Sequence, residues 1–455
     1  MRKLKITWGL VMAVTLMLVL SFGLASCAPA PTEEVAPTPT EEVTTPPTEE
    51  TTPEEVAKPY AGIKLVHFSV SDREDILIKE AAEFKAMTGI DVEIQVTAYA
   101  NMRDKLTTAL MAGEGPIDTF DMDLVWVPGF ASGGWVVEQE LTPAELEGMI
   151  PATLDASKYN GKYYARPFIS SIKYFWYNAK ILEEAGIKAP PLTWKELTEQ
   201  SLLIQEKGLV KYANVFSWAQ DECLSCDFMI LNGSFGGKEL VASDGSNNID
   251  TPETRSVLQW MADSIYKDKI TDPASITFHE DQVLNVFLAG DSAFMLNWEL
   301  WPHNQAVTDK SPVEPDMRMA LMPGTEANPN GYTINGPWTI AIAANSTKGK
   351  AAEMWLEFLT SKAQDKMRTI EFGSLPIWSS NYEDPEIIEK SFGKFSPVMD
   401  AQNEFTGRQA FSQSWYIGWS EALRLEVQNV LVQKKTPEQA LKDLAAKTEE
   451  LATQE

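Results

Sequence analysis

The chain has 455 residues, of which 44% are hydrophobic and 23% are charged. This composition is typical of a globular protein, and the length exceeds one compact core, so we expect two or more lobes. The formal net charge of -27, from 38 basic and 65 acidic residues, argues against nucleic-acid binding. Three cysteines and three histidines argue against a disulfide-rich scaffold or a histidine-based metal site, and we expect no metal and no cofactor.

The N-terminus has the features of an export signal. Arg2, Lys3 and Lys5 precede an uncharged, apolar-leaning run over residues 6–24. The run ends in Leu24-Ala25-Ser26-Cys27, which resembles the cleavage box of bacterial lipoproteins. We therefore expect residues 1–26 to be a lipoprotein signal peptide and Cys27 to carry acyl chains at the mature N-terminus. The alternative is an uncleaved membrane helix.

A tether follows the lipidated cysteine. Residues 28–58 are rich in Pro, Thr and Glu and have almost no large apolar side chains. Such a composition cannot form a packed core, so we expect residues 27–59 to be a disordered linker.

Alternation of strand and helix patterns begins at residue 60. The first strand is expected over 63–68, followed by a helix that places Ile76, Ala81, Phe84 and Met87 on one face and ends at Gly89. A strand over 92–96 follows, and strand, helix, strand indicates a parallel sheet with crossover helices. Further strands are expected over 118–123, 163–167, 172–177, 292–298, 317–322 and 338–343. The fold class is α/β.

Several helix starts are marked by capping residues. Thr193 and Glu196 are spaced as a capping box, and Thr251 and Thr436 each precede a first-turn proline. Trp355 is spaced with apolar residues at helical period, which favours packing over function.

No sequence pattern is specific for catalysis. The chain lacks the serine-hydrolase elbow, the zinc-protease helix, the phosphate loop and the dinucleotide glycine fingerprint. Abundant Asp and Glu leave a glycosidase-type carboxylate pair open. Cys223 and Cys226 form a C-x-x-C pair, for which we favour a local disulfide over free thiols if the protein is exported to an oxidising compartment.

Polar and aromatic residues recur together near expected strand ends. Asp121 and Asp123 lie close to Trp126, and related polar-aromatic mixtures recur in 174–178, 297–301, 335–338 and 376–378. Sugars need this combination, because fixed polar groups hold the hydroxyls while a ring face stacks on an aromatic plate. Ligands bind outside the carboxyl ends of strands in α/β sheets, so the pattern favours a small polar ligand.

These segments, in their order and spacing, resemble the extracellular solute-binding proteins of ABC importers, in the maltose- and trehalose-binding group. The resemblance covers nearly the whole mature chain. Its marks are Asp118–Trp135, Tyr163–Pro167, Trp176–Asn178, Glu184–Leu197, Phe287–Met295, Gly336–Ile342 and Thr436–Leu444.

The resemblance implies a two-lobe periplasmic-binding-protein fold, similar to type II, with discontinuous lobes, a hinge and the ligand in the interlobe cleft. The chain is expected to cross between lobes near Pro167, near 318 and near 376. The N-terminal lobe then comprises 60–167 and 319–376, and the C-terminal lobe comprises 168–318 and 377–455.

Ligand-binding residues follow from the same resemblance, matched position by position. They are Asp72, Asp121, Asp123, Trp126, Tyr174, Trp176, Gln220, Asp221, Trp298, Trp301, Gly336, Trp338, Trp378, Trp415 and Trp419. The chain departs from the family at Trp378, where some relatives have arginine, and at Ser170-Ser171, where others have glutamate. These departures argue against assigning maltose or trehalose specifically.

The implied function is a non-enzymatic, monomeric lipoprotein that captures a sugar or oligosaccharide by hinge closure and delivers it to an ABC permease. It would be anchored to the outer face of the cell membrane, on the periplasmic side if the host has an outer membrane. One alternative is a surface-anchored carbohydrate hydrolase. Others are a binding protein for a polyol or a glycerophosphodiester, and a purely adhesive lipoprotein.

Overall fold

The computed structural model describes residues 58–112, 115–242, 246–408 and 412–453. The expected signal peptide, Cys27 and most of the expected linker lie outside these residues. Among the described helices, none has the length and apolar composition needed to cross a bilayer.

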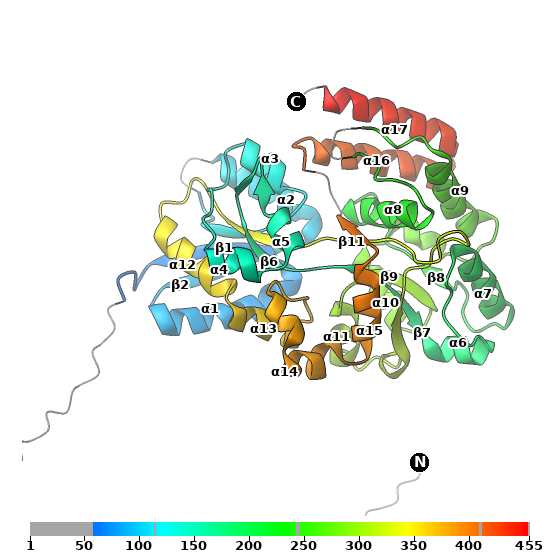
Figure 1. The fold of residues 1–455 in the computed structure, drawn as a ribbon, viewed down its shortest axis with the longest axis horizontal. Coiled ribbons are helices and arrows are strands. Elements are labelled where there is room, and N and C mark those ends of the chain that lie inside the picture. The colour runs from blue at the N-terminus through cyan, green and yellow to red at the C-terminus, as the bar shows by residue number, and fades with distance from the viewer. Residues whose placement is uncertain (1–57, 113–114, 243–245, 409–411, 454–455) are drawn as a thin grey trace, which may run out of the picture. The chain divides into compact units, whose positions relative to one another are not determined.

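Two sheets organise the described chain into a two-lobe α/β fold (Figure 1). The first sheet has five strands in the order β2-β1-β3-β12-β6, and the second has four in the order β10-β7-β9-β8. The strands of the first sheet are β1 (Lys64–Val70), β2 (Asp91–Thr97), β3 (Thr119–Asp123), β6 (Arg166–Ile169) and β12 (Trp338–Ile342). Those of the second are β7 (Lys173–Asn178), β8 (Asn214–Val215), β9 (Phe294–Trp298) and β10 (Met317–Ala320).

Both sheets mix parallel and antiparallel pairs. β1 is parallel to β2 and β3, as the strand-helix-strand pattern predicts. However, β12 runs antiparallel to both β3 and β6, and β7 runs antiparallel to β9 and β10. The expected parallel sheet is therefore confirmed for β1, β2 and β3 but does not extend to the other strands, because a strand that returns from a distant part of the chain need not follow a crossover helix. Two smaller pairs are β11 (Thr333–Asn335) with β13 (Thr406–Arg408) and β4 (Lys158–Tyr159) with β5 (Lys162–Tyr163).

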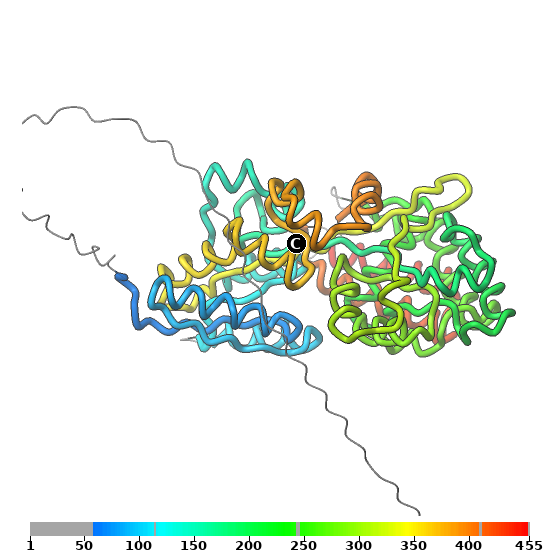
Figure 2. The backbone as a smooth tube through the Cα atoms, turned by 90° about the horizontal axis from the view of Figure 1, so that it is seen from below, coloured from blue at the N-terminus to red at the C-terminus, as the bar shows by residue number. Residues whose placement is uncertain are grey.

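Helices lie around both sheets, and the chain returns to the first sheet late in the sequence. Helices with the first sheet are α1 (Glu74–Thr88), α2 (Tyr99–Met111), α3 (Val127–Ser132), α4 (Pro143–Gly148), α5 (Pro151–Ala156), α12 (Gly349–Leu359) and α13 (Lys362–Glu371). Figure 2 shows the yellow segment with α12 and α13 beside the blue α1. The packing of α1 against α12 buries Trp355 with Phe84, so the expected core role of Trp355 is confirmed.

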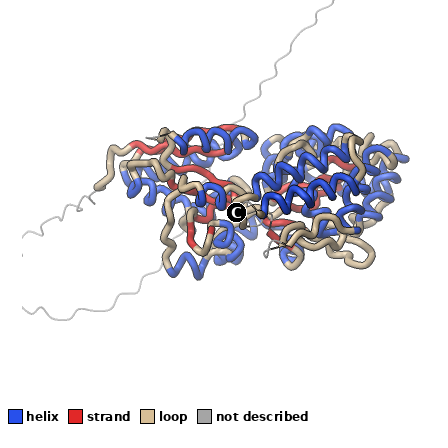
Figure 3. Tube along the Cα trace, turned by 90° about the horizontal axis from the view of Figure 1, so that it is seen from above, coloured by secondary structure: helices blue, strands red, loops and turns tan. Residues whose placement is uncertain are grey.

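The second sheet carries the remaining helices. They are α6 (Ala179–Ala185), α7 (Trp194–Glu206), α8 (Glu222–Ser234), α9 (Pro252–Tyr266), α10 (Glu280–Leu288), α11 (Trp301–Thr308), α14 (Pro385–Ile387), α15 (Ser396–Asn403), α16 (Tyr416–Leu431) and α17 (Pro437–Ala452). Short 3-10 turns occur at Ser71–Arg73, Pro273–Thr277, Glu314–Asp316, Ser379–Glu383 and Gly393–Phe395, and a π-helical turn at Ile388–Phe392. Figure 3 shows the long helices next to the C-terminus lying over the strands of this sheet.

Three segments that connect the two sheets lie side by side. The first joins β6 to β7, and its Ser170 and Ile172 form isolated bridges to Leu375 and Asn335. The expected crossing near 318 is different in the structure, because β10 pairs with β7 over Met317–Ala320. The chain returns to the first sheet only between β11 and β12.

The four helix ends predicted from sequence are present in the structure. Thr251 and Thr436 cap α9 and α17 with their side chains, and Gly89 ends α1 in a left-handed conformation at φ 75°. Thr193 caps α7, although Glu196 accepts from the Leu192 N–H and not from that of Thr193. Met87 is a correction, since it is 60% exposed at the last turn of α1 while Ile76, Ala81 and Phe84 are buried.

Candidate functional site

A cleft of about 450 Å³ opens between the ends of strands and helices from both sheets. β1, β3 and β12 of the first sheet and β9 of the second all end at or near it, together with the N-terminal ends of α8 and α10. Its lining is Val70–Arg73, Ala98–Ala100, Asp123, Ile169, Ser171, Asp221–Cys223, Cys226, His279–Gln282, Trp298, Glu299, Trp301, Gly336, Trp338 and Phe372. Trp rings and carboxyl groups therefore meet in one cavity.

The cleft contains about half of the residues expected from sequence. Asp72, Asp123, Asp221, Trp298, Trp301, Gly336 and Trp338 line it. Trp126 and Gln220 line an adjoining pocket of about 310 Å³, which shares Tyr99, Asp221 and Glu222 with the cleft. These nine residues come from both sides of the fold and are brought together only by the tertiary structure.

Asp121 lies behind the cleft wall and does not line it. Its carboxylate is fully buried, accepts from Ser69, and contacts His67 Nε2 at 3.1 Å and Arg73 Nη1 at 2.8 Å. Burial by itself would raise the pKa of Asp121, but the hydrogen bond from His67 and the charge of Arg73 hold it below its ordinary value. Asp121 therefore serves to fix Arg73, whose guanidinium lies 4.0 Å above the Trp338 ring.

Tyr174 and Trp176 are core residues in the structure. They lie on β7, which pairs on one side with β9 and on the other with β10, and both side chains pack among apolar residues of one cluster. A central strand covered on both faces buries alternate residues on either side, so neither ring lines the cleft. Trp378 is likewise buried, packs with Met149 and Ile377, and donates from Nε1 to the Thr360 carbonyl at 2.7 Å.

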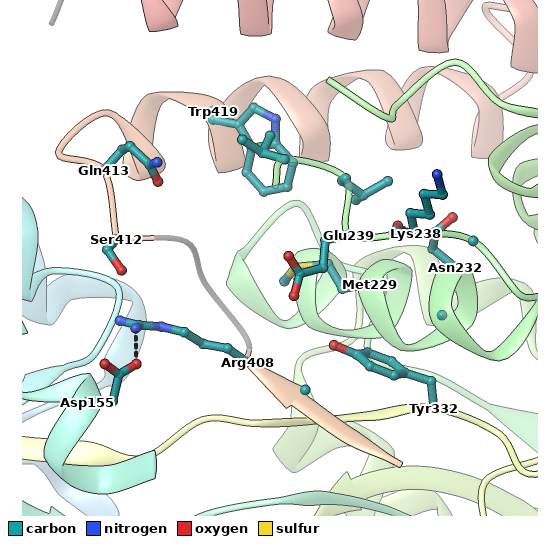
Figure 4. A pocket seen from close by; sticks show the side chains of 15 residues that line it. Asp155, Met229, Asn232, Lys238, Glu239, Tyr332, Arg408, Ser412, Gln413 and Trp419 are labelled. Atoms are coloured by element: carbon teal, nitrogen blue, oxygen red, sulfur yellow. Dashed lines mark hydrogen bonds and ion pairs between the residues drawn. The ribbon is translucent and has the colours of Figure 1, made fainter. Parts of the chain in front are cut away.

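A second cavity of about 420 Å³ lies by α16 and contains Trp419 (Figure 4). The Trp419 ring points from α16 into this cavity, and Arg408 extends from β13 to form an ion pair with Asp155. Trp415 stands one helical turn before Trp419, is half-buried, and packs against the same apolar cluster. Neither ring lines the cleft.

Two cleft carboxyls hold their protons to a much higher pH than ordinary acids do. Asp123 and Glu299 are each 5% exposed. Asp123 accepts from the Tyr99 hydroxyl at 2.9 Å, and Glu299 accepts from the Ser171 hydroxyl. Burial raises the pKa of each to about 7, because a neutral hydroxyl does not compensate the loss of water as a cation would.

A buried lysine positions one aromatic wall of the cleft. Lys173 Nζ, fully buried, lies 2.8 Å from Asp227 Oδ1 and 2.9 Å from Glu280 Oε1. Glu280 in turn accepts from Trp298 Nε1 at 2.7 Å. The charge of Lys173 thus fixes Glu280, and Glu280 fixes the indole plane of Trp298 at the cleft surface.

Cys223 and Cys226 are free thiols buried within α8, so the favoured disulfide is not formed in the structure. The physical reason is the helix itself. Residues three apart on a helix have Cβ atoms about 5–6 Å apart, whereas a disulfide needs about 3.8 Å. Both cysteines border the cleft.

Several cleft residues were not anticipated. They are Arg73, Tyr99, Ser171, Glu222, His279, Glu280, Asp281, Gln282, Glu299 and Phe372. Glu299 lies inside the aromatic segment 297–301, next to Trp298, so its place in that segment could have indicated a cleft residue. By contrast, nothing local marks His279 or Glu280 beyond the start of a helix, and only tertiary folding brings α10 to the cleft.

The chain is similar to known proteins over most of its length. A family model described as bacterial extracellular solute-binding protein matches residues 71–366. A probable ABC transporter-binding protein of Deinococcus radiodurans is 29% identical over 387 residues, covering 83% of this chain and 90% of the relative. A maltotriose-binding protein of Pyrococcus abyssi is 27% identical over 315 residues, covering 68% of this chain and 64% of the relative.

Solved structures agree with the fold. A maltose-bound MalE3 of T. maritima matches with a TM-score of 0.77 and 28% identity, covering 86% of this chain and 100% of that one. A solute-binding protein of Thermotoga lettingae, bound with alpha-D-tagatose, matches with a TM-score of 0.76 and 25% identity, covering 86% and 99%.

Proposed function

Because the chain belongs to the bacterial extracellular solute-binding proteins, we propose that it captures a sugar or oligosaccharide outside the cell for an ABC permease. One observation carries the sugar assignment. Trp298, Trp301 and Trp338 line the same cleft as seven carboxyl groups. Indole rings supply flat apolar plates and carboxylates accept hydrogen bonds from hydroxyls, which is what a pyranose presents on its faces and its edges. The relative named for maltotriose and the structure with bound maltose support this class of solute.

We propose that capture is a hinge closure. The hinge would be the three adjacent connections at 170–172, 335–337 and 373–376, which put 58–169 and 338–372 in one lobe and 173–334 and 377–453 in the other. A solute that contacts both lobes favours the closed state only by its extra contacts there. Release to the permease leaves the solute chemically unchanged.

The anchor belongs to the same proposal. A signal peptide over 1–26, an acylated Cys27 and a Pro/Thr/Glu-rich tether would hold a monomeric binding protein at the outer face of the membrane. Labelling with a radioactive fatty acid in an expressing bacterium tests the anchor. Incorporation that is lost in Cys27→Ala supports it, and equal incorporation in both contradicts it.

Titration calorimetry against a panel of sugars, oligosaccharides, polyols and glycerophosphodiesters tests the proposed function. We expect a sugar to bind, and chromatography of the mixture after prolonged incubation to return it intact. Cleavage products would instead indicate the hydrolase alternative, and binding of only a non-sugar would contradict the carbohydrate assignment.

A substitution at Trp301 tests the role of the aromatic wall. Trp301→Ala removes a half-buried ring at the start of α11, and we expect affinity for the sugar to fall by about tenfold or more. Trp301→Phe keeps an aromatic plate and is the matched control, expected to retain most of the affinity. Equal losses in the two variants would argue against ring stacking.

A further inference from the structure

The ionisable groups of the cleft are strongly unequal in sign. The acidic residues of its lining are Asp72, Asp123, Asp221, Glu222, Glu280, Asp281 and Glu299. Against these seven carboxyl groups the lining has one guanidinium, that of Arg73, and the imidazole of His279. An anionic solute would be repelled by such a surface.

The cations closest to the cleft already have carboxylate partners. Arg73 pairs with Asp121, which does not line the cleft, and Lys173 pairs both with Asp227 behind the lining and with Glu280 in it. Arg424, in the adjoining pocket, lies 3.6 Å from Asp221 and 3.8 Å from Glu222. The other four acids of the lining form no ion pair with any described residue, so their charge is left for a ligand; they are Asp72, Asp123, Asp281 and Glu299.

The buried carboxyls supply a second, independent observation. Asp123 and Glu299, nine-tenths or more buried, have neutral hydroxyls as their side-chain partners, and burial raises the pKa of each to about 7. Each lines the cleft. A cation placed there would favour their charged forms, whereas the hydroxyls of a neutral sugar compensate the cost of burying those charges only in part.

The aromatic rings of the cleft also favour a positively charged ligand. Within this cleft the Trp338 ring already has the Arg73 guanidinium at 4.0 Å, and the Trp298 ring has Lys173 Nζ at 5.4 Å. Indole faces attract cations because of the ring quadrupole. Trp301 contributes a further indole to the lining.

We propose that the solute is a sugar with a free, protonated amino group, and that the acidic lining of the cleft binds this ammonium. The inference rests on the proposed function and narrows its substrate class. Carboxylates would hold the ammonium by charge-assisted hydrogen bonds, and the tryptophan rings would hold the sugar faces. N-acetylation removes the charge, so the acetylated form of the same sugar should bind more weakly.

Three series of ligands with the same linkage separate charge from shape. Calorimetry at pH 7 would compare β-1,4-linked glucosamine, N-acetylglucosamine and glucose oligomers of one to four units. We expect the free-amine series to bind at least about tenfold more tightly than the other two. We also expect its advantage to shrink between 0.05 M and 0.5 M NaCl, because salt screens charges near the surface.

Asp72→Asn tests the acidic lining directly. Asp72 is exposed in the turn after β1, so its substitution should not disturb folding. We expect amine affinity to fall by about tenfold and affinity for the neutral series to fall by clearly less, because the asparagine amide still forms hydrogen bonds to hydroxyls but carries no charge. Glu353→Gln, which removes an exposed carboxylate of α12 outside the cleft, is the matched control and should alter neither.

The outcomes distinguish this inference from the proposed function. Tighter binding of the amine series that is lost in Asp72→Asn supports both. Equal or tighter binding of the acetylated or glucose series overturns the charge inference and leaves sugar binding intact. An equal loss for charged and neutral ligands in Asp72→Asn also overturns it. Absence of binding in this panel and in the broader sugar panel overturns both.

Discussion

Individual carboxyl groups in the cleft make the free energy of unfolding depend on pH. Asp123 and Glu299 are buried without a cation in hydrogen-bonding contact, and their pKa values are raised to about 7. In the unfolded chain the same groups have pKa values near 4. Between these values the folded state holds protons that the unfolded state has released, so stability decreases as the pH rises. A cleft arranged in this way has its acids ready to ionise when a ligand supplies positive charge.

We predict that Glu299→Gln flattens this dependence. Most ordinary carboxyls are ionised in both states above pH 6, so the raised groups dominate the acidic contribution between pH 6 and pH 8. Removing Glu299 should abolish about 1.4 kcal/mol of the stability lost across that interval. Urea unfolding at pH 6, 7 and 8 measures it, with Glu353→Gln as the surface control. Parallel pH profiles for wild type and Glu299→Gln would show that Glu299 is already ionised in the folded protein.

At the scale of elements, the ends of helices place the functional groups. Asp221 caps α8, accepting the Glu222 N–H at 2.7 Å, and both side chains face the cleft. α10 begins next to His279 and presents Glu280 and Asp281. Caps such as Thr251 and Thr436 could be predicted from sequence because a cap is a local hydrogen bond. The meeting of α8 and α10 at a common cleft could not, because it depends on how the helices pack.

We predict that the cap of α7 contributes measurably to stability. Thr193 Oγ1 accepts the Glu196 N–H at 3.1 Å, so Thr193→Ala leaves a donor unsatisfied at the helix start. The expected loss is about 1 kcal/mol in the free energy of unfolding, measured by urea denaturation. Thr193→Ser retains the hydroxyl and should stay within about 0.5 kcal/mol of wild type. A loss of similar size in both would assign the effect to the methyl group and not to the cap.

At the scale of the whole molecule, contacts between the proposed lobes decide how readily the cleft closes. Arg103 Nη2 on α2 lies 3.0 Å from Glu421 Oε1 on α16, and the side chains of Arg103 and Glu421 are 34% and 51% exposed. Exposed ion pairs contribute little, typically about 0–1 kcal/mol. The pair therefore changes the free energy of the closed state only slightly and does not prevent the cleft from reopening.

Charge reversal tests this contact. Arg103→Glu places two acids together and should lower solute affinity by about three- to fivefold, while Arg103→Glu with Glu421→Arg should restore it. X-ray scattering should show a larger radius of gyration for the single variant at equal ligand concentration. A double variant as weak as the single one would mean that the two side chains do not meet when the solute is bound.

Sequence by itself determined the elements. Seven of the eight expected strands are present, and the one expected over 163–167 is divided between β5 and β6. Trp355 is buried as its spacing predicts, because periodicity and capping depend on residues a few positions apart. The order of the segments also indicated the family before any fold was known. The resemblance correctly implied a two-lobe fold, but it placed the second crossing near 318, where β10 instead pairs with β7.

Only the tertiary structure decided which polar and aromatic residues share the cleft. The sequence gives no means of distinguishing Tyr174 and Trp378 from Trp298. In the structure, neighbouring layers enclose Tyr174 and Trp378, whereas Trp298 faces the cleft. Glu280 and Glu299 are separated by 19 positions and lie in the same lining only because α10 and β9 pack together. Whether a side chain is exposed to a ligand depends on what covers it, and that cover comes from residues distant in the sequence.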